Sequence, residues 1–392
     1  MLPVPQPRPG RSRDFQITTK LVHGPGSLAR LPEVLRELGA HSAVLVSDNA
    51  LVKAGHVGHV MKLLEQAGLR VHVFADTCEN PTDTDVQAAA TAIKPWVTGK
   101  VPVAVVALGG GSVMDSAKAA MLLATVGGSM AVHRGWMKTA NHELVLPPLV
   151  AIPTTAGTGS EVQSYALIRE DQTHAKMACG LPQLCPAAAI LDAELTVSCP
   201  PVATALAGLD ALSHAMETAV CTARHDFSLA LSQRAFQLIH GAFELVLAPP
   251  ENLPARHDML MGSCLAGLAI EHAMLGAAHA LANPLSARFG VAHGRAVGMM
   301  LPGVIRFNAE DSEVAKTYAQ LWPGHDAESL AQWVEHLLRV TRQPGSLGEL
   351  GVTKADVPVL AEEALQQWTL RFNPRAMSAP QAAKMYQALM TH

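Results

Sequence analysis

The first half of the chain alternates short, continuously apolar segments with segments of helical periodicity. Four segments are typical of strands (42–47, 70–75, 101–108 and 149–152), and the three between them are typical of helices (51–67, 83–96 and 112–125). A strand that is apolar on both faces belongs in a parallel sheet covered on both sides. The alternation therefore predicts a doubly wound α/β domain, with shorter strands near 164–168, 175–179 and 188–191.

The pattern changes after about Asp192. Pro200 and Pro201 open a region without a convincing strand, in which long helical segments cover 202–221, 226–247 and 254–274. A chain of 392 residues is typically two domains. We therefore predict three parts: a flexible tail at 1–14, an α/β nucleotide-binding domain at 15–194, and an all-α domain at 195–392.

Charge and composition exclude several classes of protein. The 29 Lys and Arg against 33 Asp and Glu give a net charge of −4. There is no basic block, so neither a nucleic acid nor a membrane surface is an expected partner. The N-terminus lacks an apolar signal segment, and the six cysteines contain no C-x-x-C pair. These features favour a cytoplasmic globular enzyme with reduced thiols.

A glycine-rich turn follows one predicted strand and opens a predicted helix. Its residues, Gly109 to Ser112, could bring backbone N–H groups and a helix N-terminus close to a phosphate. Met114 occupies the place of the last glycine in G-x-G-x-x-G, so the dinucleotide fingerprint is incomplete. An ordinary strand-to-helix turn with a capping box formed by Ser112 and Asp115 explains the turn equally well.

Two further features lie at the same predicted edge. Asp48 follows the 42–47 strand, where a carboxylate could accept hydrogen bonds from both ribose hydroxyls and repel a 2′-phosphate, favouring NAD over NADP. The alternative is an N-cap of the next helix. The turn at 153–161 is rich in hydroxyls and could hold a pyrophosphate or a ribose, or could be a plain polar loop.

Four residues in the helical half are candidate metal ligands. Asp210 and His214 are four apart and share a helix face, although a solvated pair would have the same spacing. His279 and His293 lie among small apolar residues, where an imidazole without a partner is costly. Each could be a hydrogen-bonded core residue. Together they form a nitrogen and oxygen set that suits Fe²⁺, Zn²⁺ or another first-row ion, and the lack of thiolate argues against a structural zinc.

Five segments resemble the iron-dependent (group III) alcohol dehydrogenases, whose fold is that of the dehydroquinate synthase-like superfamily. They are GGGSVMDSAK (109–118), PTTAGTGSEV (153–162), GLDALSHAMET (208–218), AHALANPL (278–285) and AHGRAVGMMLP (292–302). The resemblance implies a homodimer with a cleft between the domains, in which NAD faces a divalent metal, Fe²⁺ or alternatively Zn²⁺. It implies metal binding by Asp210, His214, His279 and His293, and NAD binding by Asp48, Gly109, Gly110, Gly111, Ser112, Asp115, Thr154, Thr155, Thr158 and Lys176.

One departure from the family concerns proton transfer. Several members have a second histidine four residues after the position of His279, whereas this chain has Asn283 there. His272 is a substitute candidate, although a surface imidazole is the plainer interpretation. Arg288 and Arg295 could pair with an anionic substrate or simply face solvent.

The resemblance implies a metal-dependent alcohol dehydrogenase, or aldehyde reductase, that transfers a hydride between a small alcohol and NAD(H). The alternatives lie in the same superfamily. They are a dehydroquinate synthase-like lyase, a metal-independent maleylacetate reductase, and a reductase of an anionic aldehyde such as phosphonoacetaldehyde. A non-catalytic binding protein has no positive support in the sequence.

Overall fold

The computed structural model describes residues 15–136, 144–172, 175–248, 252–342 and 345–390. The predicted tail at 1–14 lies outside them. The chain divides into two compact units between Cys199 and Pro200, a few residues after the predicted boundary. The first unit also takes in the beginning of α8 (Leu253–His272) as far as Leu260, and the second holds the remaining helical part.

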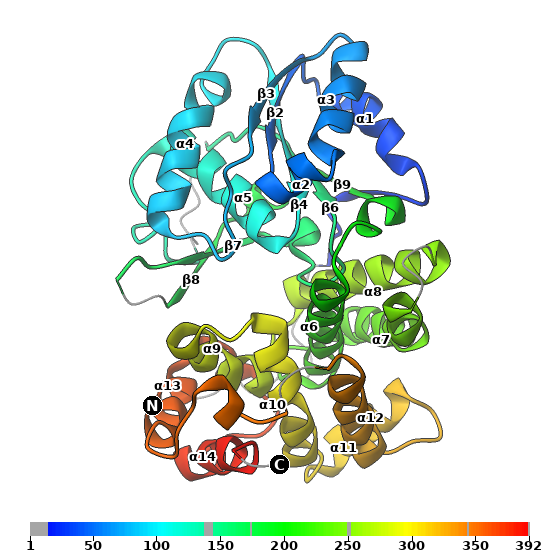
Figure 1. Ribbon diagram of the computed structural model, residues 1–392, viewed down its shortest axis with the longest axis vertical. Coiled ribbons are helices and arrows are strands. Elements are labelled where there is room, and N and C mark those ends of the chain that lie inside the picture. Colours follow the sequence, from blue (N-terminus) through cyan, green and yellow to red (C-terminus); the bar gives the residue numbers. More distant parts are fainter. Residues whose placement is uncertain (1–14, 137–143, 173–174, 249–251, 343–344, 391–392) are drawn as a thin grey trace. The chain divides into compact units, whose positions relative to one another are not determined.

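The first unit contains a six-stranded parallel sheet, as predicted (Figure 1). In β4, Val105 and Ala107 face one hydrophobic core, whereas Val106 and Leu108 face the other. This double burial explains why the strand sequences are continuously apolar. In spatial order the strands are β1 (Lys20–His23), β9 (Ala188–Leu191), β6 (Leu149–Pro153), β4 (Val103–Gly109), β2 (Ser42–Val46) and β3 (Arg70–Phe74).

Helices cover both faces of this sheet. α1 (Leu31–Glu37) and α3 (His56–Gln66) contribute to one core, and α4 (Asp83–Val97) and α5 (Gly111–Val126) contribute to the other. The single helix predicted at 51–67 is wrong. The chain forms α2 (Asn49–Lys53) and then α3, because Gly55 between them has a left-handed φ of 86° that interrupts a helix.

Two of the shorter predicted strands belong to a separate small sheet. β7 (Tyr165–Arg169) and β8 (Lys176–Gly180) pair antiparallel, and β5 (Gly135–Trp136) pairs with β8. Their side chains Ile168 and Cys179 join the core formed by α4 and α5. The third predicted short strand, β9, lies in the main sheet.

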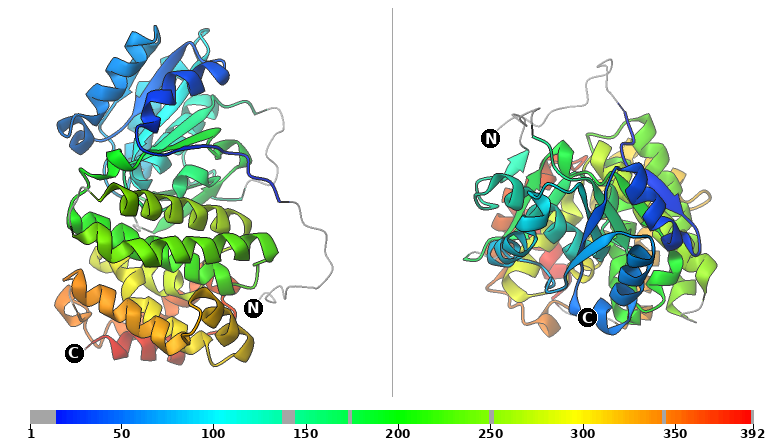
Figure 2. Two further views of the ribbon diagram at one scale, coloured as in Figure 1. Left: turned by 90° about the vertical axis from the view of Figure 1, so that its right-hand side faces the viewer. Right: turned by 90° about the horizontal axis from the view of Figure 1, so that it is seen from above.

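Helices are the regular secondary structure of the second unit, whose described residues include no strand (Figures 1 and 2). Its central helix is α6 (Pro201–Val220), which is buried from Gly208 to its end and packs against α7 and α10. The other helices are α7 (Asp226–Leu247), the rest of α8, α9 (Ala277–Phe289), α10 (His293–Asn308), α11 (Ser312–Leu321), α12 (Ala327–Val340), α13 (Val357–Gln366) and α14 (Ala379–Ala388).

No single described helix has the length and apolarity needed to cross a membrane. α8 and α9 taken together reach that length and composition, but they are bent by 103° where they meet. All six cysteines are free thiols, as expected from their spacing.

Candidate metal and dinucleotide sites

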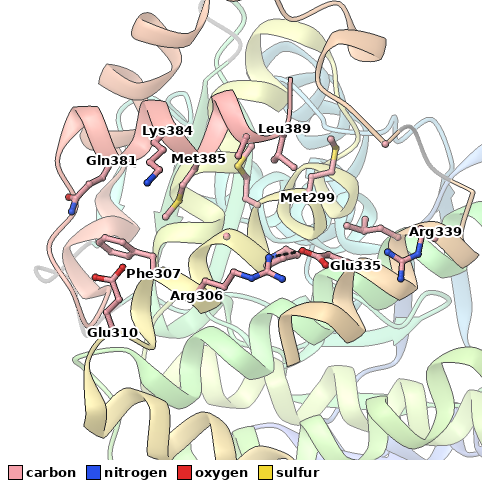
Figure 3. Close-up of a pocket in the computed structure, with 16 residues that line it drawn as sticks. Met299, Arg306, Phe307, Glu310, Glu335, Arg339, Gln381, Lys384, Met385 and Leu389 are labelled. Atoms are coloured by element: carbon pink, nitrogen blue, oxygen red, sulfur yellow. Dashed lines mark hydrogen bonds and ion pairs between the residues drawn. The ribbon is translucent and has the colours of Figure 1, made fainter. Parts of the chain in front are cut away.

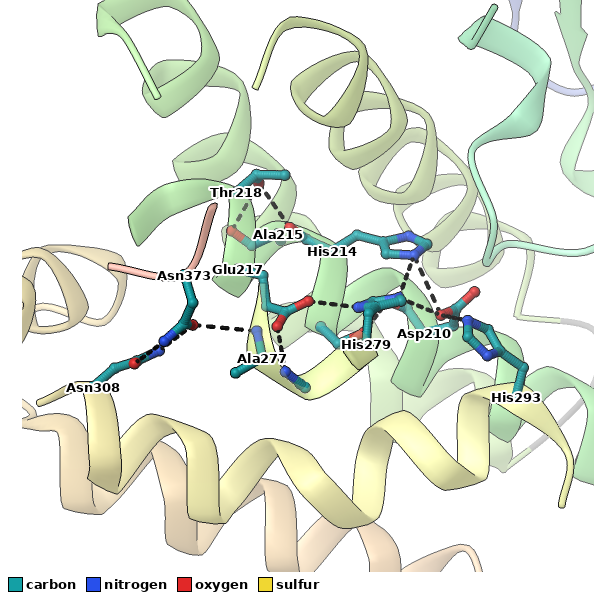
Figure 4. A network of polar contacts seen from close by, with 12 residues as sticks. Asp210, His214, Ala215, Glu217, Thr218, Ala277, His279, His293, Asn308 and Asn373 are labelled. Atoms are coloured by element: carbon teal, nitrogen blue, oxygen red, sulfur yellow. Dashed lines mark hydrogen bonds and ion pairs between the residues drawn. The ribbon is translucent and has the colours of Figure 1, made fainter. Parts of the chain in front are cut away.

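Four side chains from three helices converge in the helical unit (Figure 4). Asp210 and His214 lie one turn apart on α6, His279 lies near the start of α9, and His293 is the first residue of α10. The Nε2 atoms of His214 and His279 are 3.1 Å apart. Oδ1 of Asp210 lies 3.3, 3.5 and 3.7 Å from Nε2 of His214, His279 and His293, respectively. The structure therefore brings the four predicted ligands together.

Four distances between these donor atoms, from 3.1 to 3.7 Å, are close to those between ligands of one first-row ion, and the ligand atoms of Asp210, His279 and His293 all lie within 4.8 Å of one another. Four ligands at about 2.1 Å from a tetrahedral ion lie about 3.4 Å from one another. Oδ1 of Asp210 is buried and accepts no hydrogen bond from the described residues, although three imidazole nitrogens face it. The set contains no thiolate. It fits Fe²⁺, Zn²⁺ or a similar ion, which would satisfy the otherwise unpaired oxygen.

The electrostatics of the cluster favour a positive charge. Burial lowers the pKa of the His279 imidazole, but Glu217 and Asp210 outweigh burial and raise it to about 9. Burial would raise the pKa of Asp210, yet the neighbouring imidazoles hold it well below its usual range. Two buried carboxylates thus stabilise a cation among the three rings, whether a proton or a metal ion.

Glu217 is a member of this site that the sequence analysis missed. Its Oε2 lies 2.5 Å from Nδ1 of His279, and its Oε1 accepts a hydrogen bond of 2.6 Å from the Ala278 N–H. The side chain is buried. Glu217 follows Asp210 by seven residues on α6, so the two lie on the same helix face. That spacing is the signal that could have identified it.

Two glycines allow the starts of α9 and α10 to lie close to α6. A Cβ at Gly294 would stand 2.0 Å from the carbonyl oxygen of Leu206 on α6. A Cβ at Gly276 would stand 2.9 Å from Oδ1 of Asn373 and 3.2 Å from Oε1 of Glu217. Glycine leaves the room that a larger residue would fill at both positions. Gly294 directly follows His293, and Gly276 shortly precedes His279.

The predicted proton-transfer residues make their contacts elsewhere. His272 ends α8, where its ring centroid is 4.4 Å from that of Phe15, and burial lowers its pKa. Asn283 donates a 3.0 Å hydrogen bond to Gln367. Arg288 is exposed to solvent, as expected, and forms an ion pair with Glu363. None of these contacts involves a candidate metal ligand, and the proton route stays a prediction.

The predicted dinucleotide edge lies at a switch in the strand order of the first unit. After β2 the chain forms β3 on one side of it, whereas β4 lies on the other side. Doubly wound sheets bind ligands at such a point, beyond the carboxyl ends of the strands. Asp48 follows β2 and Gly109 ends β4, and the Ser47 hydroxyl joins the two ends by donating to the Leu108 carbonyl at 2.9 Å.

The glycine turn starts α5 without a side-chain cap. α5 begins at Gly111 and its N-cap is Gly110, so the capping box proposed for Ser112 and Asp115 is wrong. The Ser112 hydroxyl instead accepts a hydrogen bond of 3.1 Å from the Asn80 N–H. No side-chain oxygen of the residues that the structure describes caps the first N–H groups of α5, so these groups are available to a phosphate.

The threonine loop after β6 packs directly on this turn. A Cβ at Gly111 would lie 2.5 Å from Cγ2 of Thr158, and one at Gly110 would lie 3.2 Å from Oγ1 of Thr155. The Thr154 N–H donates to the Gly109 carbonyl at 3.1 Å. The structure therefore brings together the glycine turn and all three predicted threonines.

Behind the loop, ionisable side chains hold it in place. Lys118, missed by the sequence analysis, is fully buried and donates to the backbone and hydroxyl oxygens of Ser160, both at 2.7 Å. The Asp115 carboxylate accepts from the Ser160 hydroxyl at 2.7 Å and from the Leu167 N–H at 3.1 Å. Burial raises the pKa of Asp115, and the charges of Lys118 and Lys176 oppose that rise. Both oxygens of Asp115 are thus engaged by the protein.

Asp48 is an N-cap, which was the alternative interpretation of this residue. Its Oδ1 accepts a 2.9 Å hydrogen bond from the Leu51 N–H, so it caps α2. One oxygen suffices for that bond, and Asp48 is only half-buried. The interaction with ribose remains a prediction.

A groove of about 900 Å³ lies in the helical unit among α10, α12 and α14 (Figure 3). Its lining is mainly apolar, including Met299, Met385 and Leu389, and an ion pair between Arg306 and Glu335 crosses one side. None of the predicted metal or nucleotide ligands lines it. We therefore assign the chemistry to the converging side chains rather than to this groove.

Comparison with known proteins identifies the family of the chain. The chain matches the model of the iron-containing alcohol dehydrogenases over residues 18–193 and that of the family's C-terminal domain over residues 204–390. The chain belongs to the iron-containing alcohol dehydrogenase family. This confirms the resemblance found in the sequence.

Individual relatives span almost the whole chain. A choline dehydrogenase of Bacillus subtilis is 32% identical over 93% of this chain and 92% of its own length. A 1,3-propanediol dehydrogenase of Klebsiella pneumoniae is 30% identical, covering 96% and 98%. The structure of a sulfoacetaldehyde reductase from Bifidobacterium kashiwanohense in complex with NAD⁺ superposes with a TM-score of 0.86 at 27% identity, covering 97% and 99%. The chain is therefore an oxidoreductase of the alcohol dehydrogenase and aldehyde reductase class.

Proposed function

We propose that this alcohol dehydrogenase uses NAD(H) and a divalent metal ion, Fe²⁺ or alternatively Zn²⁺, to interconvert a small alcohol and its aldehyde. The observation that carries the proposal is the convergence of Asp210, His214, His279 and His293 within 3.1 to 3.7 Å of their nearest neighbours in the cluster. Such a bound ion would polarise the substrate oxygen, and the nicotinamide would exchange the hydride.

The residues of the chain have separate tasks in this proposal. The four ligands hold the ion. The glycine turn, Gly109 to Ser112, binds the pyrophosphate at the start of α5. Thr154, Thr155 and Thr158 contact phosphate, ribose or nicotinamide, Lys176 reaches the nicotinamide ribose, and Asp48 accepts from the adenosine ribose.

Anaerobic purification followed by elemental analysis tests the metal. A panel of alcohols and aldehydes, each with NAD(H) and NADP(H) in parallel, tests the reaction. We expect close to one divalent ion per chain and net formation of NADH from an alcohol. Absence of any metal-dependent redox reaction across the panel would contradict the proposal.

The same panel separates the alternatives. A dehydroquinate synthase-like lyase would give product without net NADH, and a maleylacetate reductase-like enzyme would keep its activity after complete metal removal. An anionic aldehyde such as phosphonoacetaldehyde would be preferred over neutral ones if a cation of the chain pairs with the substrate. The exposed guanidinium of Arg288 already pairs with Glu363, which makes it a weaker candidate for that role.

We further propose a cytoplasmic homodimer. Light scattering of the purified protein gives the mass directly. A mass of about twice 41.3 kDa is expected, and a monomer would remove this part of the proposal.

A further inference from the structure

The Glu217 carboxylate contacts one backbone N–H group and one imidazole nitrogen. The Ala278 backbone N–H can only donate, and it lies 2.6 Å from Oε1. The other oxygen lies 2.5 Å from Nδ1 of His279. If both oxygens accept, the imidazole proton is held on Nδ1, and the Nε2 lone pair faces Asp210 and His214.

A second buried side chain supports the same turn of helix. Oδ1 of Asn373 accepts a hydrogen bond from the Ala277 N–H at 3.2 Å. Asn373 and Asn308 also exchange amide hydrogen bonds of 2.8 and 3.1 Å, and both are buried. Asn373 comes from the segment before α14, far along the chain from α9 (Figure 4).

The start of α9 depends on these two side chains. Its N-cap, Gly276, has no side chain, so the first N–H groups of the helix have no local acceptor. Glu217 and Asn373 supply acceptors for the first two. His279 therefore enters the metal cluster from a helix end whose position is set by α6 and by the segment before α14.

We propose that Glu217 is the positioning residue of the metal centre: it fixes both the tautomer and the location of His279, with Asn373 holding the adjoining backbone. This inference rests on the metal site proposed above. Carboxylates that orient a metal-bound imidazole typically change metal affinity by about 10- to 100-fold when they are removed.

Glu217→Gln is a nearly isosteric test. Its single carbonyl oxygen cannot accept from both N–H groups, so the amide NH₂ must face either Ala278 or His279. If it faces His279, the ring proton moves to Nε2, which can then no longer bind a cation. We expect the affinity for Co²⁺, followed by its visible absorption spectrum, to fall by about 10- to 100-fold.

Tyr386→Phe is the matched control. The Tyr386 hydroxyl is buried and donates to the Leu281 carbonyl of the same helix at 2.7 Å, without touching His279. This variant should keep the Co²⁺ affinity and spectrum of the wild type. An equal loss in both variants would show that α9 merely needs to be stable, and would overturn the specific role of Glu217.

A second measurement needs no variant. Nitrogen NMR of histidine-labelled, Zn²⁺-loaded wild type should show the His279 proton on Nδ1 and the metal on Nε2. A metal bond to Nδ1, or undiminished Co²⁺ binding by Glu217→Gln, would refute the inference. If the wild type binds neither Co²⁺ nor Zn²⁺, the proposed function fails as well. If it binds both ions but the tautomer or the Co²⁺ affinity of Glu217→Gln is not as expected, the inference alone fails.

Discussion

The metal cluster and the glycine turn use their polar side chains in opposite ways. In the cluster, Asp210 and three imidazoles face one another, and a buried oxygen is left without a hydrogen bond. Behind the glycine turn, Asp115 and Lys118 face into the protein and are satisfied by the loop they hold. The groups left for a ligand there are backbone N–H groups and hydroxyls.

The metal cluster would bind its ion through side chains, whereas the glycine turn would bind a dinucleotide through the shape of its backbone. Removing a side chain from the cluster would remove a proposed metal ligand directly. At the turn, a change acts by moving the loop of Thr158 relative to the start of α5, because the two are in close contact. The predictions below test this contrast, beginning with the largest effect.

His279→Ala should abolish metal binding and lower turnover by about a thousandfold or more, because a metal ion contributes several kcal/mol to such a reaction. The exposed His59 on α3 provides the control, because it lies far in the sequence from all four candidate metal ligands. Metal content and kcat are measured on both. Unchanged turnover in His279→Ala would remove the role assigned to that residue.

Glu161→Gln should change how stability depends on pH. Burial raises the pKa of Glu161 from 4.5 to about 7, so the folded state binds the proton more tightly than the unfolded state. The free energy of unfolding therefore falls as pH rises between these values, by about 3 kcal/mol in all.

In Glu161→Gln that fall should disappear, and the variant should be more stable than the wild type at pH 8. Denaturant unfolding across pH 4.5 to about 8 measures it. The exposed Glu362→Gln should leave the pH dependence as it is in the wild type. A wild type whose stability does not fall over this range would contradict the assignment.

Gly111→Ala should destabilise the first unit by about 1–3 kcal/mol and weaken NAD⁺ binding, because the new Cβ meets Thr158 at 2.5 Å. Gly58→Ala on α3 meets nothing within 4 Å and should instead stabilise by about 0.5–1 kcal/mol. Denaturant unfolding measures the stability of the two variants, and calorimetric titration measures their affinity for NAD⁺. Equal changes in stability and in NAD⁺ affinity in the two variants would show that the turn and the loop are not tightly packed.

Asp48→Ser should have the smallest effect. Serine keeps the acceptor that caps α2 but removes the charge, so stability should hold within about 0.5 kcal/mol. The preference for NAD⁺ over NADP⁺ should narrow about fivefold to tenfold, since two charges about 4 Å apart in water repel by about 1 kcal/mol. An unchanged ratio of kcat/KM values would leave Asp48 as a helix cap alone.

Sequence patterns predicted the parts of the fold that depend on regular spacing. Apolar runs identified β2, β3, β4 and β6, and the four-residue spacing of Asp210 and His214 placed them on one helix face. The convergence of His279 and His293 on that face could not follow from spacing, because it depends on how α9 and α10 pack against α6. The family resemblance supplied it.

Apart from the helix that Gly55 interrupts, the errors concern residues whose partners are distant in sequence. Ser112 and Asp115 matched a local capping box, but their partners are Asn80 and the Ser160 loop. Lys118 was part of a quoted motif, yet nothing local marks it as buried beneath that loop. Glu217 was an exception, since its helical spacing from Asp210 was visible in the sequence.

The most direct test of the account is a crystal structure determined after anaerobic loading with Fe²⁺, with anomalous data at the iron edge. We predict one strong peak, about 2.0–2.2 Å from a carboxylate oxygen of Asp210 and from Nε2 of His214, His279 and His293. No peak at that point, with the four side chains directed away from one another, would contradict it.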